Sequence, residues 1–188
     1  MIRFDHVTFG YEAEHPVLRE LSLEIPEGDR VCLTGASGQG KTTVLRLLLG
    51  LEQPQRGAVI RPEGTRFSVV FQEDRLLPWK TALENAALTG SAEDARCWLT
   101  ELGLGDSLDA LPEALSGGMK RRAALARALA HPFDVLVLDE ALTGLDEAAK
   151  ARCLAAIDRA VGPQKTLVMA CHDPAEAAAL AARTIPVA

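Results

Sequence analysis

The sequence predicts an α/β fold whose central sheet is mainly parallel and covered by helices. Strand-like and helix-like segments alternate over much of the chain, and strand–helix–strand units build parallel sheets. The segment 135–138 is apolar throughout, which is typical of a strand buried on both faces of such a sheet. A glycine-rich loop also joins a predicted strand at 30–34 to a predicted helix at 42–49.

The individual elements follow from hydrophobic periodicity and from breaker residues. Alternating residues predict the first two strands, and a Pro-Glu-Gly-Asp turn precedes the third. The full set of expected strands is 2–9, 21–25, 30–34, 58–60, 67–71, 135–138 and 166–171. The expected helices, the first of which is closed by Gly50, are 42–49, 81–88, 92–102, 116–130, 146–160 and 174–182.

Length and composition restrict the class of protein. A chain of 188 residues with 48% hydrophobic residues can build one domain with a substantial core. The net charge of −6 argues against general nucleic-acid binding, which requires a basic face. We expect no signal peptide and no membrane span, so that any membrane link is made by a partner. The four cysteines lack metal-ligand spacing and are expected to be reduced thiols of a cytosolic protein: Cys32, Cys97, Cys153 and Cys171.

The loop at 35–42 reads Gly-Ala-Ser-Gly-Gln-Gly-Lys-Thr and fits the phosphate-binding pattern G-x-x-x-x-G-K-S/T. Glycines let backbone N–H groups curl around phosphates, and the helix N-terminus adds its positive dipole end. Lys41 is expected to reach the outer phosphates, and the Thr42 hydroxyl to ligate Mg²⁺. A glycine-rich turn without a ligand is the alternative, and the adjoining lysine and hydroxyl argue against it.

The carboxylate pair Asp139 and Glu140 is the second candidate, at the end of the apolar strand 135–138. A parallel strand delivers its last residues to the ligand-binding edge of the sheet. We expect Asp139 to hold the Mg²⁺ shell. Because neighbouring strand residues face opposite sides, Glu140 is expected to point elsewhere and to accept a proton from an attacking water. An ordinary acidic loop is the alternative.

Residues 115–119, Leu-Ser-Gly-Gly-Met, precede a basic helix and narrow the class further. They resemble the LSGGQ signature of the ABC ATPases, and the other motifs of that family follow in the usual order. Tyr11 resembles the aromatic residue that stacks on adenine, Gln72 the Q-loop glutamine, and His172 the switch histidine. Residues 143–146 resemble the D-loop.

The resemblance implies a P-loop NTPase of the ABC ATPase type. Its core sheet would be mainly parallel, with an N-terminal antiparallel β subdomain and an inserted helical subdomain. Within a single domain at 1–188, the nucleotide-binding core would comprise 1–72 and 117–188, and the helical subdomain 73–116.

The resemblance also implies a role for each site residue, and it implies ATP and Mg²⁺ as cofactors. Two copies would enclose two ATP molecules head to tail, each between the phosphate loop of one copy and the signature of the other. The catalytic residues would be Glu140, His172, Lys41 and Gln72, and the metal-binding residues Thr42, Gln72 and Asp139. The nucleotide-binding residues would be Tyr11, Gly35, Ala36, Ser37, Gly38, Gln39, Gly40, Lys41, Thr42, Thr43, Ser116, Gly117 and Gly118.

Four of these residues also have simpler interpretations. Tyr11 could pack at a strand end, Gln72 could be a solvated polar residue, and His172 could be a structural histidine. Ser116 could be an N-cap, which is compatible with its signature role.

The segment 72–79, Gln-Glu-Asp-Arg-Leu-Leu-Pro-Trp, resembles the Q-loop of bacterial importers for nitrate, sulfonates and taurine. This implies a transporter motor on the cytoplasmic face of the membrane, with permease subunits contacting the region from Gln72 to Trp79. An extracytoplasmic solute-binding protein would complete the system. Leu76, Leu77 and Trp79 would either offer an apolar patch to a permease helix or pack inside the helical subdomain.

The chain departs from the family pattern at Met119, where glutamine is usual, and at Ala141, where proline is frequent. It ends soon after His172, which predicts a minimal motor without a regulatory domain. A soluble ABC-type ATPase without a membrane partner is the main alternative, and the single cassette argues against it. Glu140 and His172 argue against a non-hydrolysing module, and 115–118 against a small-molecule kinase.

Overall fold

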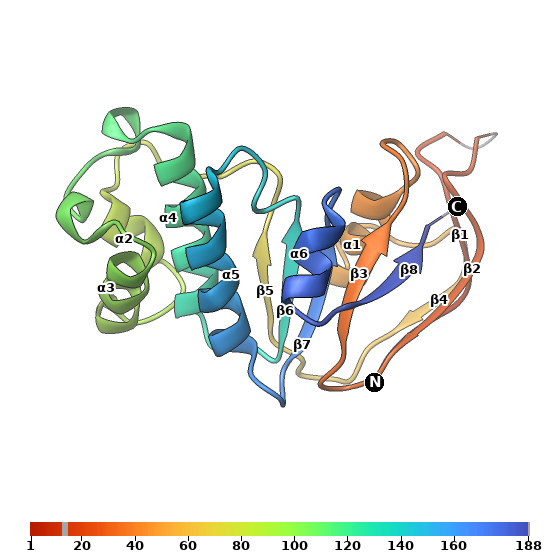
Figure 1. Cartoon of the computed structure of the whole chain (residues 1–188). Coiled ribbons are helices and arrows are strands. Elements are labelled where there is room, and N and C mark those ends of the chain that lie inside the picture. Colours follow the sequence, from red (N-terminus) through yellow and green to blue (C-terminus); the bar gives the residue numbers. More distant parts are fainter. Residues whose placement is uncertain (13–14, 188) are drawn as a thin grey trace.

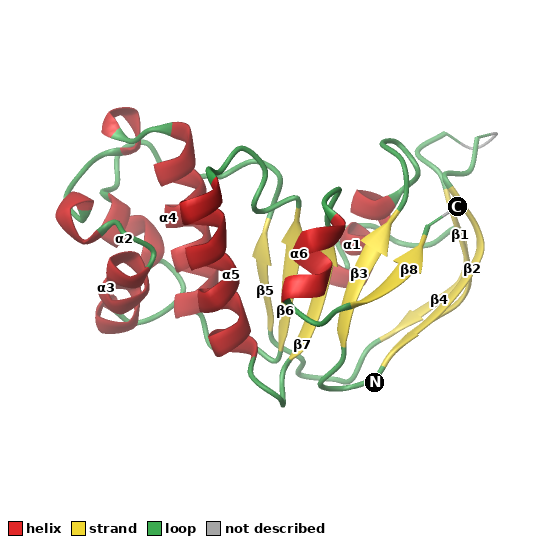
Figure 2. Cartoon of the chain, viewed as in Figure 1, coloured by secondary structure: helices red, strands yellow, loops and turns green. Residues whose placement is uncertain are grey.

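The computed structural model describes residues 1–12 and 15–187. Five parallel strands form the central sheet in the order β5-β6-β7-β3-β8, and three antiparallel strands form a second sheet in the order β2-β1-β4 (Figures 1 and 2). The predicted fold class is therefore confirmed. The strands are β1 (Ile2–Phe9), β2 (Leu18–Ile25), β3 (Arg30–Thr34), β4 (Arg56–Ile60), β5 (Phe67–Val70), β6 (Val135–Asp139), β7 (Thr166–Ala170) and β8 (Arg183–Pro186). The helices are α1 (Lys41–Leu49), α2 (Ala82–Ala86), α3 (Ala92–Glu101), α4 (Gly117–Ala130), α5 (Glu147–Val161) and α6 (Pro174–Ala179), with short 3-10 turns at Gly105–Ser107 and Pro112–Ala114.

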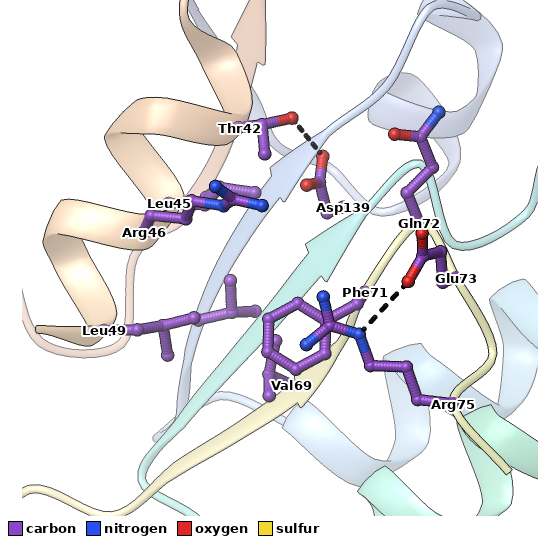
Figure 3. Close-up of a pocket in the computed structure, with 11 residues that line it drawn as sticks. Thr42, Leu45, Arg46, Leu49, Val69, Phe71, Gln72, Glu73, Arg75 and Asp139 are labelled. Atoms are coloured by element: carbon purple, nitrogen blue, oxygen red, sulfur yellow. Dashed lines mark hydrogen bonds and ion pairs between the residues drawn. The ribbon is translucent and has the colours of Figure 1, made fainter. Parts of the chain in front are cut away.

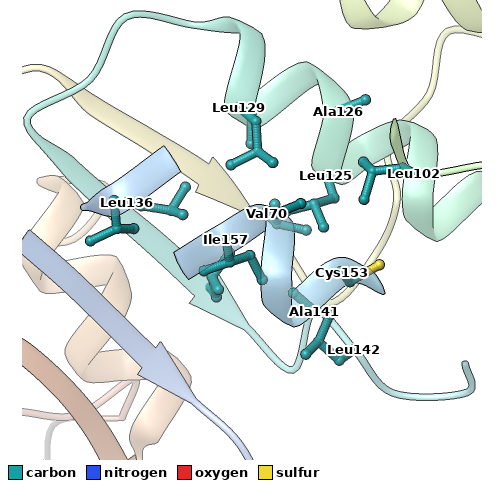
Figure 4. Packing of buried hydrophobic residues seen from close by; sticks show 14 of the residues in the cluster. Val70, Leu102, Leu125, Ala126, Leu129, Leu136, Ala141, Leu142, Cys153 and Ile157 are labelled. Atoms are coloured by element: carbon teal, nitrogen blue, oxygen red, sulfur yellow. The ribbon is translucent and has the colours of Figure 1, made fainter. Parts of the chain in front are cut away.

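Both faces of the parallel sheet are buried, as the apolar strand at 135–138 predicts. Leu136 and Leu138 belong to the core formed with helices α4, α5 and α6, part of which Figure 4 shows. Val135 and Val137 belong to the opposite core, formed with α1 and the antiparallel sheet. Successive residues of a strand face opposite sides, so a strand between two apolar layers must be apolar at every position.

Helices α2 and α3 lie at the end of the molecule farthest from the antiparallel sheet and pack against α4 (Figure 1). Both begin at a side-chain cap. The Thr81 hydroxyl accepts the Glu84 N–H while the Glu84 carboxylate accepts the Thr81 N–H, and the Ser91 hydroxyl accepts the Asp94 N–H. These caps fix where the helices start.

The structure corrects several predicted boundaries. Strand β2 begins three residues before the predicted 21, because Leu18 is buried in the core despite the polar residues that follow it. Helix α2 is shorter than the predicted 81–88, since residue 81 is its cap. The predicted helix 174–182 ends at Ala179, and the chain then forms β8, which the sequence analysis missed. Strand β8 pairs in parallel with β3 at the sheet edge, a contact between residues far apart in sequence. Among the described residues, no helix is long and apolar enough to cross a bilayer.

Candidate active site

The glycine-rich loop joins the C-terminal end of β3 to the first turn of α1, as predicted. Gly40 is the N-cap of α1 with φ of 93°, and a Cβ there would lie 2.9 Å from the side chains of Leu18 and Val17. Only glycine fits this backbone and this space. Because Gly40 has no capping side chain, the first N–H groups of α1 stay available to an anion.

The Lys41 side chain bonds to the backbone of the glycine-rich loop. Its ammonium donates to the Gly35 carbonyl at 2.8 Å and to the Ala36 carbonyl at 3.1 Å, while its side chain is buried. The Gln39 amide oxygen accepts the Ala36 N–H at 2.5 Å, which ties the two ends of the loop together. The positive charge is therefore held at the loop, where phosphate oxygens could replace the two carbonyls.

Thr42 and Asp139 meet between the loop and the sheet. The Thr42 hydroxyl donates to Asp139 Oδ1 at 3.2 Å, and Figure 3 shows the pair beside an adjoining pocket. Burial raises the pKa of Asp139, because its charge is removed from water at the end of β6. A hydroxyl and a buried carboxylate are hard oxygen donors of the kind that Mg²⁺ prefers, so this pair fits the predicted metal site.

Glu140 joins three chain segments at the edge of the sheet. Its carboxylate lies 2.7 Å from His172 Nε2 and accepts the Gln72 amide N–H at 3.5 Å. Asp139 and Glu140 point in different directions, as predicted, although the reason differs. Strand β6 ends at Asp139, and Glu140 adopts a left-handed conformation with φ of 51°.

Tyr11 stands over α1 with most of its ring exposed. The ring packs edge-on against Phe9 with centroids 5.2 Å apart, and its hydroxyl lies 3.5 Å from Thr43 Oγ1. Its contact with Phe9 matches the packing interpretation, and its exposed face leaves the stacking role open. Arg46, which the sequence analysis did not single out, donates to the Tyr11 hydroxyl at 3.4 Å. Its position four residues after Thr42 on α1 could have indicated the shared face.

Most of these groups line one open depression on the protein surface. Gly35, Ala36 and Gln39 do not line it; the carbonyls of Gly35 and Ala36 accept from Lys41, and Gln39 accepts the Ala36 N–H. The depression is lined by Tyr11, Val17, Ser37, Gly38, Gly40, Lys41, Thr42, Thr43, Arg46, Gln72 and Glu140. A smaller pocket continues from Thr42, Arg46 and Gln72 toward Asp139 (Figure 3), and the apolar residues Val69 and Val137 are also part of its lining.

The signature residues do not line this depression. Ser116 caps α4 by accepting the Met119 N–H at 3.3 Å, as predicted, and Ser116 and Gly117 are exposed. The first turn of α4 therefore presents backbone N–H groups to solvent. Asp146 of the D-loop caps α5 in the same way, by accepting the Ala149 N–H at 2.8 Å.

Two arginines of α4 hold the loop that follows β5, and the sequence analysis missed both. Arg121 Nη1 donates to the carbonyls of Phe71 at 3.2 Å and of Gln72 at 2.7 Å. Arg127 donates to the carbonyls of Arg75 at 2.7 Å and of Asp74 at 2.9 Å. One rigid helix thus connects the signature residues to the loop of Gln72.

Leu76, Leu77 and Trp79 were predicted either to form an exposed apolar patch or to pack inside the helical subdomain, and they differ in burial. Leu76 is half-buried and packs against the core, and Leu77 is also half-buried. Trp79 is 71% exposed. Trp79 is therefore the most exposed of the three, and Leu76 is the one that packs against the core.

Sequence comparison places these features in a known family. The family model described as "ABC transporter" matches residues 18–143. An aliphatic sulfonates import ATP-binding protein of Agrobacterium fabrum is 42% identical over 98% of this chain and 70% of that protein. The protein of the same name from Burkholderia cenocepacia is 42% identical over 90% of this chain and 56% of its own length, and the one from Rhodococcus jostii is 37% identical over 98% and 79%.

Solved structures agree with the sequence comparison. The dimeric post-hydrolysis structure of the ATP-binding cassette MJ0796 bound to ADP and Pi superposes with a TM-score of 0.90 at 27% identity, covering 100% of this chain and 94% of that one. A bacterial Atm1-family ABC exporter with ATP bound gives a TM-score of 0.87 at 26% identity, over 94% of this chain and 35% of that chain. With the family model, the relatives and the fold in agreement, the chain belongs to the ABC transporter family and has the fold of its ATP-binding cassettes.

Proposed function

We propose that this chain binds and hydrolyses ATP as the motor subunit of an ABC importer and works as a head-to-tail dimer. The observation that carries the proposal is the division of the site. Lys41, Thr42 and Glu140 share one depression, whereas the exposed helix end at Ser116 lies outside it. A second copy that supplies its own Ser116, Gly117 and Gly118 would complete the phosphate site.

Nucleotide binding is assigned to the depression. Tyr11 would stack on the base, because its ring face is exposed above α1. The backbone of 35–43 and the Lys41 ammonium would hold the phosphates. Thr42, Gln72 and Asp139 would hold Mg²⁺, which when bound neutralises phosphate charge during hydrolysis.

The hydrolytic step is assigned to Glu140 and His172. The Glu140 carboxylate would accept a proton from the attacking water at the edge of the phosphate site. The contact between His172 Nε2 and Glu140 would orient that carboxylate, and the Gln72 amide would bind the same group from the opposite loop. These three groups come from different loops, so their spacing depends on the position of each loop.

Each copy in the dimer is proposed to keep the predicted division of the chain into a nucleotide-binding core and a helical subdomain. The core at 1–72 and 117–188 would carry the phosphate loop, and the helical part at 73–116 would carry the surface for the permease. The dimeric structure of MJ0796 with bound ADP and Pi supports the proposal of a dimer.

Transport is proposed from the relatives. Several of them are described as aliphatic sulfonates import ATP-binding proteins, so a small sulfonate is the solute class that we favour. Permease subunits would contact the segment from Gln72 to Trp79 on the cytoplasmic face of the membrane, and an extracytoplasmic protein would deliver the solute. The exposed indole of Trp79 offers the apolar contact.

The hydrolytic proposal is tested with Glu140→Gln. We expect ATP binding and ATP-dependent dimerisation to persist while turnover falls at least about 100-fold, the range of a lost general base. Calorimetry, light scattering and phosphate release measure the three properties. Glu147→Gln is the matched control, because that side chain is 94% exposed and touches no group of the depression. Turnover of Glu140→Gln within threefold of the unmodified chain would refute the assignment.

The transport proposal is tested by isolating complexes. Tagged Glu140→Gln protein, purified from detergent-solubilised membranes with ATP and Mg²⁺, should bring down a multi-span membrane protein. Trp79→Glu should weaken that capture, and Leu51→Glu, at another exposed apolar residue, should not. Capture of soluble partners alone would favour the alternative of an ABC-type ATPase without a membrane partner.

A further inference from the structure

Two buried cysteines touch each other directly behind the proposed active site. Cys32 lies in β3 and Cys171 is the first residue after β7, and their sulfurs are 3.0 Å apart. Cys32 pairs with Met169 across the two parallel strands, so Cys171 lies two positions further along on the same face of the sheet. Both cysteines are free thiols, 0% and 5% exposed.

Each thiol is close to one of the loops that carry the chemistry. Strand β3 leads through Thr34 into the glycine-rich loop, and Cys171 immediately precedes His172. The Cys171 thiol also donates to the Asp173 carbonyl at 3.4 Å. A bond between the two sulfurs would therefore link the phosphate-loop strand to the loop of His172.

We propose that Cys32 and Cys171 form a reversible oxidation site that closes to a disulfide when the protein meets hydrogen peroxide. One thiol sulfur attacks the peroxide, the O–O bond breaks, and a sulfenic acid and water are formed. The second thiol sulfur then attacks the sulfenic sulfur, the S–O bond breaks, and a second water leaves with the remaining proton. Two thiols and one peroxide thus give one disulfide and two waters.

The local geometry favours this pair over the other cysteines. The sulfurs need to approach by only about 1 Å to reach bonding distance. The hydrogen bond between the two thiols lowers the pKa of Cys32 and raises that of Cys171. Burial raises the pKa of Cys153 to about 11, while Cys97 is exposed on α3. Cys171 lies just past the end of β7, where local opening costs less than in the strand and would admit peroxide.

Closure of the disulfide should reduce ATP hydrolysis, and this consequence rests on the proposed function. Drawing Cys171 toward β3 moves the peptide that carries His172, whose Nε2 lies 2.7 Å from Glu140. A shift of about 1 Å in a reacting group lowers turnover by as much as 100-fold. We expect at least a tenfold loss that dithiothreitol reverses.

The test uses the purified full chain with Cys97→Ser and Cys153→Ala, so that only the pair remains. After peroxide treatment and denaturation, iodoacetamide should label neither thiol, and dithiothreitol should restore both labels. In Cys171→Ala added to this background, Cys32 can at most form a sulfenic acid, which dimedone traps, and no disulfide can displace the loop of His172. Turnover of this variant should therefore resist peroxide.

Labelling of both thiols after peroxide, or a product that dithiothreitol does not reduce, would overturn the proposed site. A disulfide that leaves turnover unchanged would overturn its effect on hydrolysis. If the reduced chain hydrolyses no ATP, the proposed function fails, while thiol labelling still decides the fate of the pair.

Discussion

Asn85 fixes the loop that carries Trp79, and its replacement by alanine should destabilise the protein measurably. The side chain is 0% exposed. Its oxygen accepts the Leu77 N–H at 2.8 Å, and its amide donates to the carbonyls of Leu77 at 3.1 Å, Lys80 at 2.8 Å and Thr81 at 3.0 Å. Alanine removes all four bonds and leaves a backbone donor without its partner.

The expected cost follows from these contacts. Each hydrogen bond contributes a net value of about 0.5–1.5 kcal/mol to the free energy of unfolding. Because some of the freed carbonyls can bond to water in the variant, we expect the loss of all four bonds to cost about 3 kcal/mol. For a chain of this size, this corresponds to a Tm lower by about 6–12 °C. Urea denaturation followed by circular dichroism measures the free energy of unfolding. Trp79 fluorescence, recorded in a Trp98→Phe background that removes the second indole, reports on the loop.

Thr100→Ala is the control for Asn85→Ala. That exposed hydroxyl donates only to the Arg96 carbonyl within its own helix, so a change below about 0.5 kcal/mol is expected. A loss below about 1 kcal/mol in Asn85→Ala, together with unchanged Trp79 fluorescence, would refute the reasoning.

Three further predictions concern the site. Arg121→Gln should lower kcat about tenfold with little change in ATP affinity, because Arg121 positions the backbone of Gln72 and does not itself line the depression; a loss in affinity alone would contradict this. Asp139 has a raised pKa, so the folded state binds more protons than the unfolded state and stability falls as pH rises from the unfolded value of 3.8 through the folded one. Asp139→Asn should therefore raise the Tm at neutral pH without Mg²⁺, and Mg²⁺ should no longer stabilise the variant. In acid, the difference in Tm between the variant and the unmodified chain should disappear. Thermal scans across pH measure these differences. Tyr11→Ala should weaken ATP binding by about tenfold in calorimetry while Tyr11→Phe retains it, because stacking on a base contributes about 1–3 kcal/mol.

Much of the fold and the local parts of the site could be predicted because their determinants are contiguous in sequence. The loop at 35–42 is a strand–glycine–helix sequence, and its conformation follows from which residues tolerate a left-handed backbone. The cap formed by Ser116 follows from a hydroxyl residue three positions before an N–H donor. The apolar composition of residues 135–138 is sufficient to predict a strand that is buried on both faces.

The remaining features depend on which strands are neighbours and on their register, and neither is encoded within a single segment. Strand order brings Glu140 to His172 and Gln72, and register brings Cys171 to Cys32. Hydrophobic periodicity did not predict β8, because this short edge strand is defined by its pairing with β3 and not by a pattern of its own.

The sequence by itself determined the family, the conformation of the glycine-rich loop and the residue types of the proposed site, since each depends on local spacing. Only the tertiary structure decided that Trp79 is exposed while Leu76 packs on the core, and that Arg121 ties the signature helix to the Q-loop. Such contacts join residues tens of positions apart. Their formation depends on the packing of whole helices and sheets, whose free energy is distributed over many side chains and is therefore not visible in any short motif.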